Sequence, residues 1–394
     1  MQDIKSITAD RIQELSTHNK EPNWILEKRL EAWHAFQNTE MPDLKYGLDI
    51  RMDLRGLDIN KVNPNVIENI QMPDRKDIII RPLTDAINEN PEIVKKHFMR
   101  TANLTDKFSS LHWALWNRGL FIYVPKGVQA ENLHLNFDAV DGSVLENILI
   151  VLEPLSSLTF LETLSGNPVF RSSVTEIFLG EGARLNFGSL QKYGQTTYNF
   201  SARKAYTERD AKLDWVTFDM GSFRTLSDIT TVMTSPGAES RTIGMYFGNS
   251  SQQFNFSVNS IHAAPDTTSD MLVKGALNDH AKVIYRGLVK IEKNACRSNG
   301  YQLEDTLLLS DDAEADPVPN LEIDNNDVRC THGTTVGHVD PDKIFYMMSR
   351  GIDEVEAKKR IVEGFFEPVI NKLTVKVMEN DLRKLLEKKI EEIK

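Results

Sequence analysis

Hydrophobic residues follow a helical period near the start of the chain. The segment EPNWILEKRLEAWHAF carries Leu26, Leu30 and Trp33 at positions i, i+4 and i+7, the spacing of one buried helix face. A second segment of this kind is LTDKFSSLHWALWNRG, in which Gly119 is placed to end the helix. The pattern therefore predicts an N-terminal helical region over residues 1–118.

From about Gly119 the helical period disappears and short β-rich runs begin. Four runs share the order turn, small residue, alternating strand: SSLTFLETL (156–164), GARLNFGSL (182–190), DAKLDWVTF (210–218) and GAESRTIGM (237–245). Ala183, Ala211 and Ala238 occupy the same place in the last three runs, 28 and then 27 residues apart. Two later runs have the same shape at looser spacing: HAKVIYRGL (280–288) and DAEADPVPN (312–320).

This recurrence predicts a β-solenoid over residues 119–338. In a solenoid each coil buries its apolar positions against the neighbouring coils, so the same turn and strand pattern returns once per coil. A β-sandwich is the competing interpretation. It would explain the short strands equally well, but not turn residues that recur near one fixed interval.

The pattern becomes helical again after the last strand-like run and predicts a C-terminal helical region over residues 339–394. Asp340 can cap a helix whose first residue is Pro341, and a second helix follows with Asp353 and Glu356 at capping-box spacing. Its wide apolar stripe consists of Ile361, Val362, Phe365, Phe366, Val369 and Ile370.

Composition limits the possible classes of function. The chain of 394 residues is 40% hydrophobic and 26% charged, enough to bury a core, and its net charge of -11 disfavours nucleic acid and anionic membranes as partners. It contains no run of eighteen apolar residues, and its first fifteen residues lack the apolar region of a secretory signal. We therefore expect a cytoplasmic protein whose two cysteines remain thiols.

Several common catalytic motifs are missing from the sequence. It has no Walker-type phosphate loop and no G-x-G-x-x-G, so we expect no nucleotide to bind directly to this chain. It also lacks the G-x-S-x-G elbow of many hydrolases and the H-E-x-x-H motif of zinc proteases. The sequence therefore indicates a protein that is not an enzyme.

Cys330 and His332 are the residues most suggestive of metal chemistry. On a strand, residues i and i+2 share a face, so the thiol and the imidazole could bind one soft or borderline metal such as iron or zinc. Two ligands do not complete a tetrahedral site, and His338 and Cys296 are the other local candidates. A metal site would need ligands from another chain. A structural cysteine beside an ordinary histidine remains the alternative.

Three segments together carry a resemblance that extends over essentially the whole chain. They are LLLSDDAEADPVPNLEIDNNDVRCTHGTTVGHVDPDKIFYMMSRGI near the C-terminus, EPNWILEKRLEAW near the start, and GLFIYVPKGV at 119–128. The sequence resembles the SufB/SufD family of iron-sulfur cluster assembly proteins, and within it the SufD branch. The resemblance implies a right-handed parallel β-helix between N-terminal and C-terminal helical regions, in a non-catalytic scaffold subunit of the SUF machinery.

The resemblance also implies the partners. The family's complex joins a SufB-type subunit, a SufD-type subunit and the ABC ATPase SufC, which would supply the nucleotide chemistry missing here. A transient iron-sulfur cluster would be held at the subunit interface and shared with the partner chain, which is a SufB-type chain or a second copy of this one. The residues expected to dock the ATPase are Ile344, Phe345, Ile361, Phe365 and Phe366.

The resemblance assigns unequal roles to the residues of the motif. In SufB-type sequences the segment matching Thr331 to Gly333 reads Glu-His-Glu, and a cysteine proposed as a cluster ligand falls near Glu304. This chain has neither feature, which argues against the cysteine-rich scaffold subunit. The family's histidine, a proposed cluster ligand at the interface, carries over directly to His332. The carry-over to Cys330 is weaker.

Two other functions remain open at this point. A purely architectural subunit would only stabilise its partner. A β-helix enzyme acting on polysaccharides would use carboxylate or basic clusters along a groove and usually works outside the cell. The sequence does not decide between a heterodimer and a homodimer, nor the type of cluster.

Overall fold

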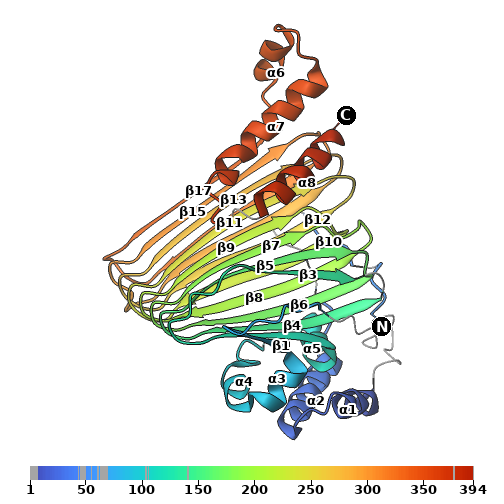
Figure 1. Cartoon of the computed structure of the whole chain (residues 1–394). Coiled ribbons are helices and arrows are strands. Elements are labelled where there is room, and N and C mark those ends of the chain that lie inside the picture. Colours follow the sequence, from blue (N-terminus) through green and yellow to red (C-terminus); the bar gives the residue numbers. More distant parts are fainter. Residues whose placement is uncertain are drawn as a thin grey trace.

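The computed structural model describes residues 8–42, 44, 50–54, 56–59, 62, 70–102, 104, 106–139, 142–375 and 378–393 (Figure 1). Its strands are β1 (Ile79–Pro82), β2 (Arg118–Val124), β3 (Leu133–Ala139), β4 (Ser143–Leu152), β5 (Ser157–Gly166), β6 (Phe170–Leu179), β7 (Arg184–Gln191), β8 (Tyr198–Thr207), β9 (Lys212–Asp219), β10 (Arg224–Met233), β11 (Glu239–Gly248), β12 (Gln253–His262), β13 (Thr268–Leu277), β14 (Lys282–Ile291), β15 (Asn299–Leu308), β16 (Glu314–Ile323) and β17 (Arg329–His338).

Successive strands alternate between two sheets. The even sheet runs in the order β1-β2-β4-β6-β8-β10-β12-β14-β16, and the odd sheet in the order β17-β15-β13-β11-β9-β7-β5-β3. Neighbours from β2 onward are parallel, while β1 is antiparallel to β2. The predicted parallel β-helix is confirmed. A β-sandwich is excluded, because each coil gives one strand to each sheet and pairs in register with the next coil.

The space between the sheets holds stacked apolar side chains that explain the sequence repeat. Phe160 on β5, Phe187 on β7 and Trp215 on β9 occupy the same register position in successive coils. All three are fully buried, with ring centroids 5.3 Å apart in the first pair and 5.0 Å apart in the second. In these coils one turn of the solenoid thus equals the predicted interval of 27 or 28 residues, because each ring must meet its equivalent in the next coil.

The recurring alanines lie at the corners of the coils, where the chain enters a strand. Ala183, Ala211 and Ala238 are buried and precede β7, β9 and β11 of the odd sheet. The later Ala281 and Ala313 are also buried, but they precede β14 and β16 of the even sheet. The two groups therefore mark opposite corners of the solenoid, and small residues serve both because the corners are tightly packed. The looser spacing of the later runs agrees with the longer later coils, since Lys282 pairs with Glu314, 32 residues on.

Helices lie at both ends of the chain. They are α1 (Ala9–His18), α2 (Asn23–Asn38), α3 (Leu83–Glu89), α4 (Pro91–His97), α5 (Lys107–Leu115), α6 (Pro341–Met348), α7 (Glu354–Ile370) and α8 (Glu379–Glu391). The first group packs on the outer face of the even sheet, where Trp113 and Phe36 share a buried cluster with Leu145 and Phe170. No helix in the described part of the chain has both the length and the apolar composition needed to span a lipid bilayer.

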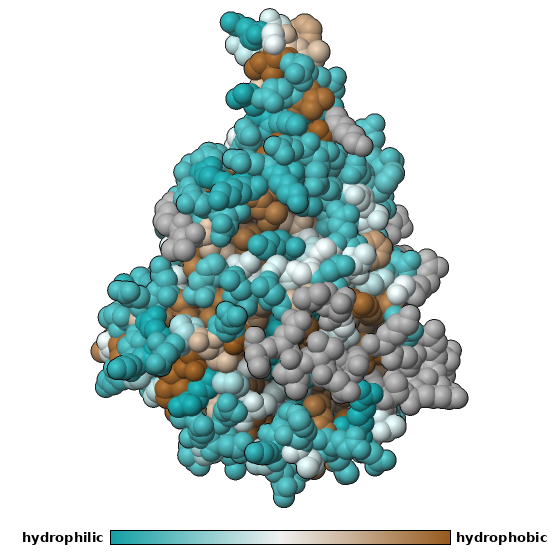
Figure 2. Space-filling model, turned by 45° about the vertical axis from the view of Figure 1, so that its right-hand side comes forward, coloured by the Kyte–Doolittle hydropathy of each residue, from teal (hydrophilic) through white to brown (hydrophobic). Residues whose placement is uncertain are grey.

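The C-terminal helices pack on the outer face of the odd sheet. Val362 and Phe366 of α7 and Leu382 of α8 are buried against sheet residues that include Val216 and Met245. Both helical regions thus share their cores with the solenoid, and the boundaries at 118 and 338 stay a prediction about chain organisation. The helix α6 instead projects beyond the last coil, and apolar side chains appear on this projecting end (Figures 1 and 2).

Candidate functional site

The segment that contains Cys330 and His332 forms β17, the last strand of the odd sheet. Its partner β15 places Gly300 beside Cys330 and Gln302 beside His332. Because residues two apart share a strand face, Cys330 and His332 both face the inside of the solenoid. This is the last coil, so that inner face is open to solvent and His332 is exposed.

Cys330 is held more tightly than His332. Its side chain is half-buried and packs on the interior cluster, in space left by Gly300, where an added Cβ would lie 3.3 Å from the sulfur. Burial raises the pKa of the Cys330 thiol, which disfavours the thiolate that a metal requires. The geometry therefore favours His332 over Cys330 as a ligand.

The two other local candidates do not join them. His338 shares the same face of β17 but lies six residues from His332, a separation of about 20 Å along a strand. Cys296 lies in the turn before β15, where its sulfur accepts a hydrogen bond from Arg297 Nη1 at 3.3 Å. Within the described ranges, no three His, Cys, Asp or Glu side chains form a group that could hold a metal ion.

Glu304 is the residue near which the resemblance places the cysteine of SufB-type sequences. It is buried on β15, accepts a hydrogen bond from the hydroxyl of Tyr246 at 2.9 Å, and accepts another from Thr334 Oγ1 at 3.2 Å. Burial raises the pKa of this carboxyl group. Glu304 thus anchors β17 to the interior of the last coils.

The free edge of β17 carries a continuous row of backbone hydrogen-bonding groups. Arg329 and Val339 donate their amides to Ser298 O at 3.0 Å and to Leu308 O at 3.3 Å, so the odd-numbered amides face β15. The amides of the even-numbered residues, from Cys330 to His338, therefore face the free edge. None of these residues is a proline, and the edge can accept an added strand.

The free edge of β16 is different. Glu314 and Asp324 donate their amides toward β14, at 3.1 and 2.9 Å, so here the odd-numbered positions face outward. Two of those positions are Pro317 and Pro319, which have no amide hydrogen. The centre of this edge therefore cannot donate to an incoming strand. This difference between the two free edges was not predicted from the sequence. Two prolines separated by one residue in a strand-like run could have indicated it.

The five predicted docking residues differ greatly in exposure. Phe345 on α6 is 73% exposed, whereas Phe366 on α7 is fully buried against the odd sheet. Phe365 is half-buried, with the ammonium of Lys274 4.2 Å from its ring centre. Ile344 and Ile361 are half-buried as well. Phe366 is thus occupied by the chain's own core, and Phe345 is the better candidate for contact with a partner.

Further exposed apolar side chains adjoin Phe345 in sequence. They are Tyr346, Met348 and Val355, which are 60%, 46% and 37% exposed. The described residues of α6 include no buried side chain. Aromatic residues on such a projecting helix are typical anchors of protein-protein interfaces.

Comparison with known proteins gives the family. A family model for "SUF system FeS cluster assembly, SufBD core domain" matches residues 135–365, and a model for the "SufBD protein N-terminal region" matches residues 53–133. The iron-sulfur cluster assembly protein SufD of Bacillus subtilis is 28% identical over 98% of both chains. SufBD family proteins of Staphylococcus haemolyticus and Staphylococcus epidermidis are 26% identical over 94% of this chain and 90% of theirs. The chain therefore belongs to the SufB/SufD family of iron-sulfur cluster assembly proteins, in its SufD branch.

Proposed function

We propose that this chain is a non-catalytic partner subunit of the SUF machinery in the cytoplasm. It pairs with a SufB-type chain through β17 and binds a SufC-type ATPase through α6 and the adjoining part of α7. Membership of the family supports the general role. The detailed roles rest on the geometry of the last coil and of the projecting helix.

The observation that carries this proposal is the open last coil. A solenoid buries apolar and hydrogen-bonding groups only between neighbouring coils, so an uncovered coil leaves both exposed. Here the exposed groups include Ile323 on β16 and Val336 on β17, which are 42% and 38% exposed, together with the free amides of β17. A partner strand would cover these groups, and a second copy of this chain is the alternative occupant.

The iron-sulfur cluster is the cargo of this interface. His332 offers an exposed imidazole at the edge that the partner covers, and Cys330 offers a thiol of raised pKa two residues away. At most two ligands come from this chain, so thiolates of the partner subunit would complete the coordination of iron. Nucleotide hydrolysis belongs to the ATPase in this proposal.

Replacing Phe345 with aspartate is expected to weaken capture of the SufC-type ATPase about tenfold or more, since an exposed aromatic anchor commonly contributes about 2 kcal/mol or more to binding. Because α6 has no buried side chain, the fold should be unaffected. The measurement is ATPase binding by surface plasmon resonance. Val169→Asp is the matched control, an exposed apolar residue before β6 that is 50% exposed. Equal binding by Phe345→Asp and wild type would remove α6 from the docking site.

Co-purification from the native host tests the proposal as a whole. A tagged copy of this chain is expected to retain a SufB-type chain and a SufC-type ATPase in fixed stoichiometry, together with iron and acid-labile sulfide. Recovery of a homodimer with the ATPase would favour the second copy as occupant of the β17 edge. Recovery of the chain alone, without iron, would contradict the proposal.

A further inference from the structure

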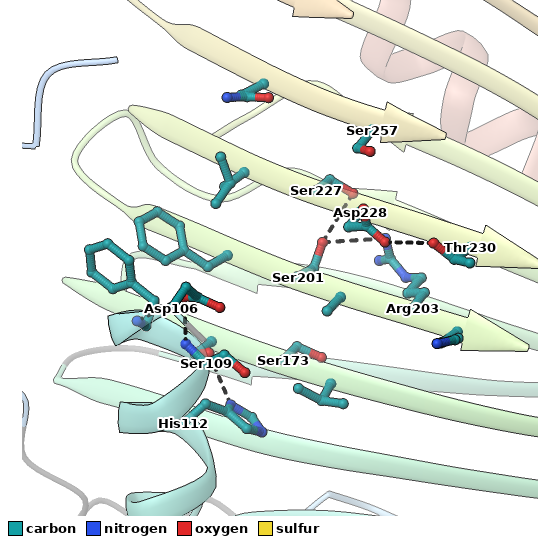
Figure 3. A pocket seen from close by; sticks show the side chains of 18 of the residues that line it. Asp106, Ser109, His112, Ser173, Ser201, Arg203, Ser227, Asp228, Thr230 and Ser257 are labelled. Atoms are coloured by element: carbon teal, nitrogen blue, oxygen red, sulfur yellow. Dashed lines mark hydrogen bonds between the residues drawn. The ribbon is translucent and has the colours of Figure 1, made fainter. Parts of the chain in front are cut away.

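A cavity of about 460 Å³ lies on the outer face of the even sheet, beside α5 (Figure 3). Small side chains create the hollow. Val174 on β6, Ala202 on β8, Asp228 on β10 and Ser257 on β12 form one row across the sheet. Helix α5 contributes Phe108 to one wall. The volume is within the range of small-molecule sites, about 300–1,000 Å³.

One end of the cavity presents a carboxylate. Asp228 accepts a hydrogen bond from Thr230 Oγ1 at 2.9 Å (Figure 3). It accepts another from Asn259 Nδ2 at 3.2 Å. The Ser257 hydroxyl also bonds to this carboxylate. A carboxylate offers about four lone-pair positions, so these three bonds leave it able to accept from a bound cation or hydroxyl group. Figure 3 places Asp228 and Thr230 together in the lining of the cavity.

A donor group lies on the neighbouring strand. Asn255 on β12 is 1% exposed, and its Oδ1 accepts a hydrogen bond from Arg286 Nη2 at 2.8 Å. Its Nδ2 is a buried donor for which the described residues supply no acceptor. Buried polar groups almost always have a partner, so this one needs an explanation. A carboxylate bound beside the Arg286 guanidinium would satisfy it.

The remaining wall is apolar. Phe200, Leu226 and Asn255 lie side by side in register on β8, β10 and β12. The rings of Phe108 and Phe200 are nearly perpendicular, at 87°, with centroids 4.6 Å apart. Apolar surface thus adjoins Asn255, the residue that carries the unpaired donor.

We propose that this cavity binds a free α-amino acid with an apolar side chain. Its ammonium group binds Asp228, its carboxylate binds Asn255 beside Arg286, and its side chain packs on Phe108 and Phe200. Asp228 pairs with Ser257 and Leu226 pairs with Asn255, so Asp228 and Asn255 are diagonal neighbours on adjacent strands, about 7–8 Å apart. An α-amino acid can bridge this span with one hydrogen bond at each of its two charged groups. Lys204 and Asp106 also line the cavity. The Asp106 carboxylate is already engaged, because it accepts hydrogen bonds from two backbone amides at the start of α5.

Isothermal titration calorimetry with the purified full-length chain tests this site. L-leucine or L-phenylalanine is expected to bind at one molecule per chain. Phenethylamine lacks the carboxylate and 3-phenylpropionate lacks the ammonium group, and each is expected to bind at least about tenfold more weakly than phenylalanine, because each leaves a charged partner unmatched. Absence of amino-acid binding, or equal affinity for the truncated analogues, would overturn the proposal.

Two variants locate the binding in the cavity. Asp228→Asn preserves shape and removes the charge, and Ala202→Phe fills the hollow; both are expected to weaken binding at least about tenfold. Asp214→Asn on the opposite sheet is the control, since its carboxylate pairs with Arg241 outside the cavity. Circular dichroism checks that each variant is folded. Unchanged affinity in folded Asp228→Asn would refute the assignment even if Ala202→Phe did not fold.

Discussion

Replacing Thr334 with proline is expected to weaken strongly the pairing of this chain with its partner. The amide of Thr334 faces the free edge of β17, so the change leaves the β15 ladder intact and removes a donor at the centre of the edge. A carbonyl of the partner would lose its donor, at about 1–3 kcal/mol, and the proline ring would obstruct the incoming strand. Analytical ultracentrifugation of the mixed subunits should show at least about tenfold weaker association.

Thr334→Ala is the matched control for this experiment. Both substitutions remove the hydrogen bond from Thr334 Oγ1 to Glu304, but only proline removes the amide hydrogen. The alanine variant should therefore pair nearly as well as wild type. If both variants associate normally, the partner does not add a strand to β17.

Replacing His332 with alanine is expected to remove most of the iron and acid-labile sulfide from the purified complex without dissociating its subunits. The imidazole is exposed at the interface edge, while the backbone groups that pair the strands are unchanged by the substitution. The measurement is iron and sulfide per complex, with subunit stoichiometry determined on the same sample.

Cys330→Ala is expected to have a milder effect on cluster content than His332→Ala. Its sulfur packs above Gly300, and burial raises the pKa of its thiol, so loss of packing should exceed loss of ligation. Full cluster content in the His332→Ala complex would instead assign this chain a purely architectural role. A larger loss in Cys330→Ala would reverse the order of the two residues.

The solenoid could be predicted from sequence because its determinants are local and repeated. Each coil brings its own turn and alternating strand, and the coil interval is short enough for rings such as Phe187 and Trp215 to recur visibly. The strand that carries Cys330 and His332 could be predicted for the same reason. The alanines of the two corners could not be told apart from the sequence, because both corners of the solenoid use the same small residue.

Contacts between distant segments could not be predicted in the same way. The carboxylate of Glu146 lies between the guanidinium groups of Arg118, at 2.6 Å, and Arg171, all buried inside the solenoid. These residues come from three different coils, and nothing local marks them as partners. Burial alone would raise the pKa of Glu146, but the two arginines hold it below its ordinary value.

The apolar stripe of α7 shows a related limit. A stripe has the same pattern whether it packs on the chain's own sheet or on another protein, so Phe366 looked available for docking although it is fully buried. Phe345, on a helix without a buried face, stands out only when the exposure of each side chain is known.

The two ends of the solenoid are unlike, and this limits polymer growth. At the first coil β1 already pairs with β2, and the exposed positions of the edge strand β3 are the polar His134, Asn136 and Asp138. Among the residues that the structure describes, the last coil alone offers a strand edge with a continuous row of free amides beside exposed apolar side chains. When two such ends pair with each other, neither chain keeps a free edge of this kind. The product is a closed pair, and raising the protein concentration would complete pairs without building filaments.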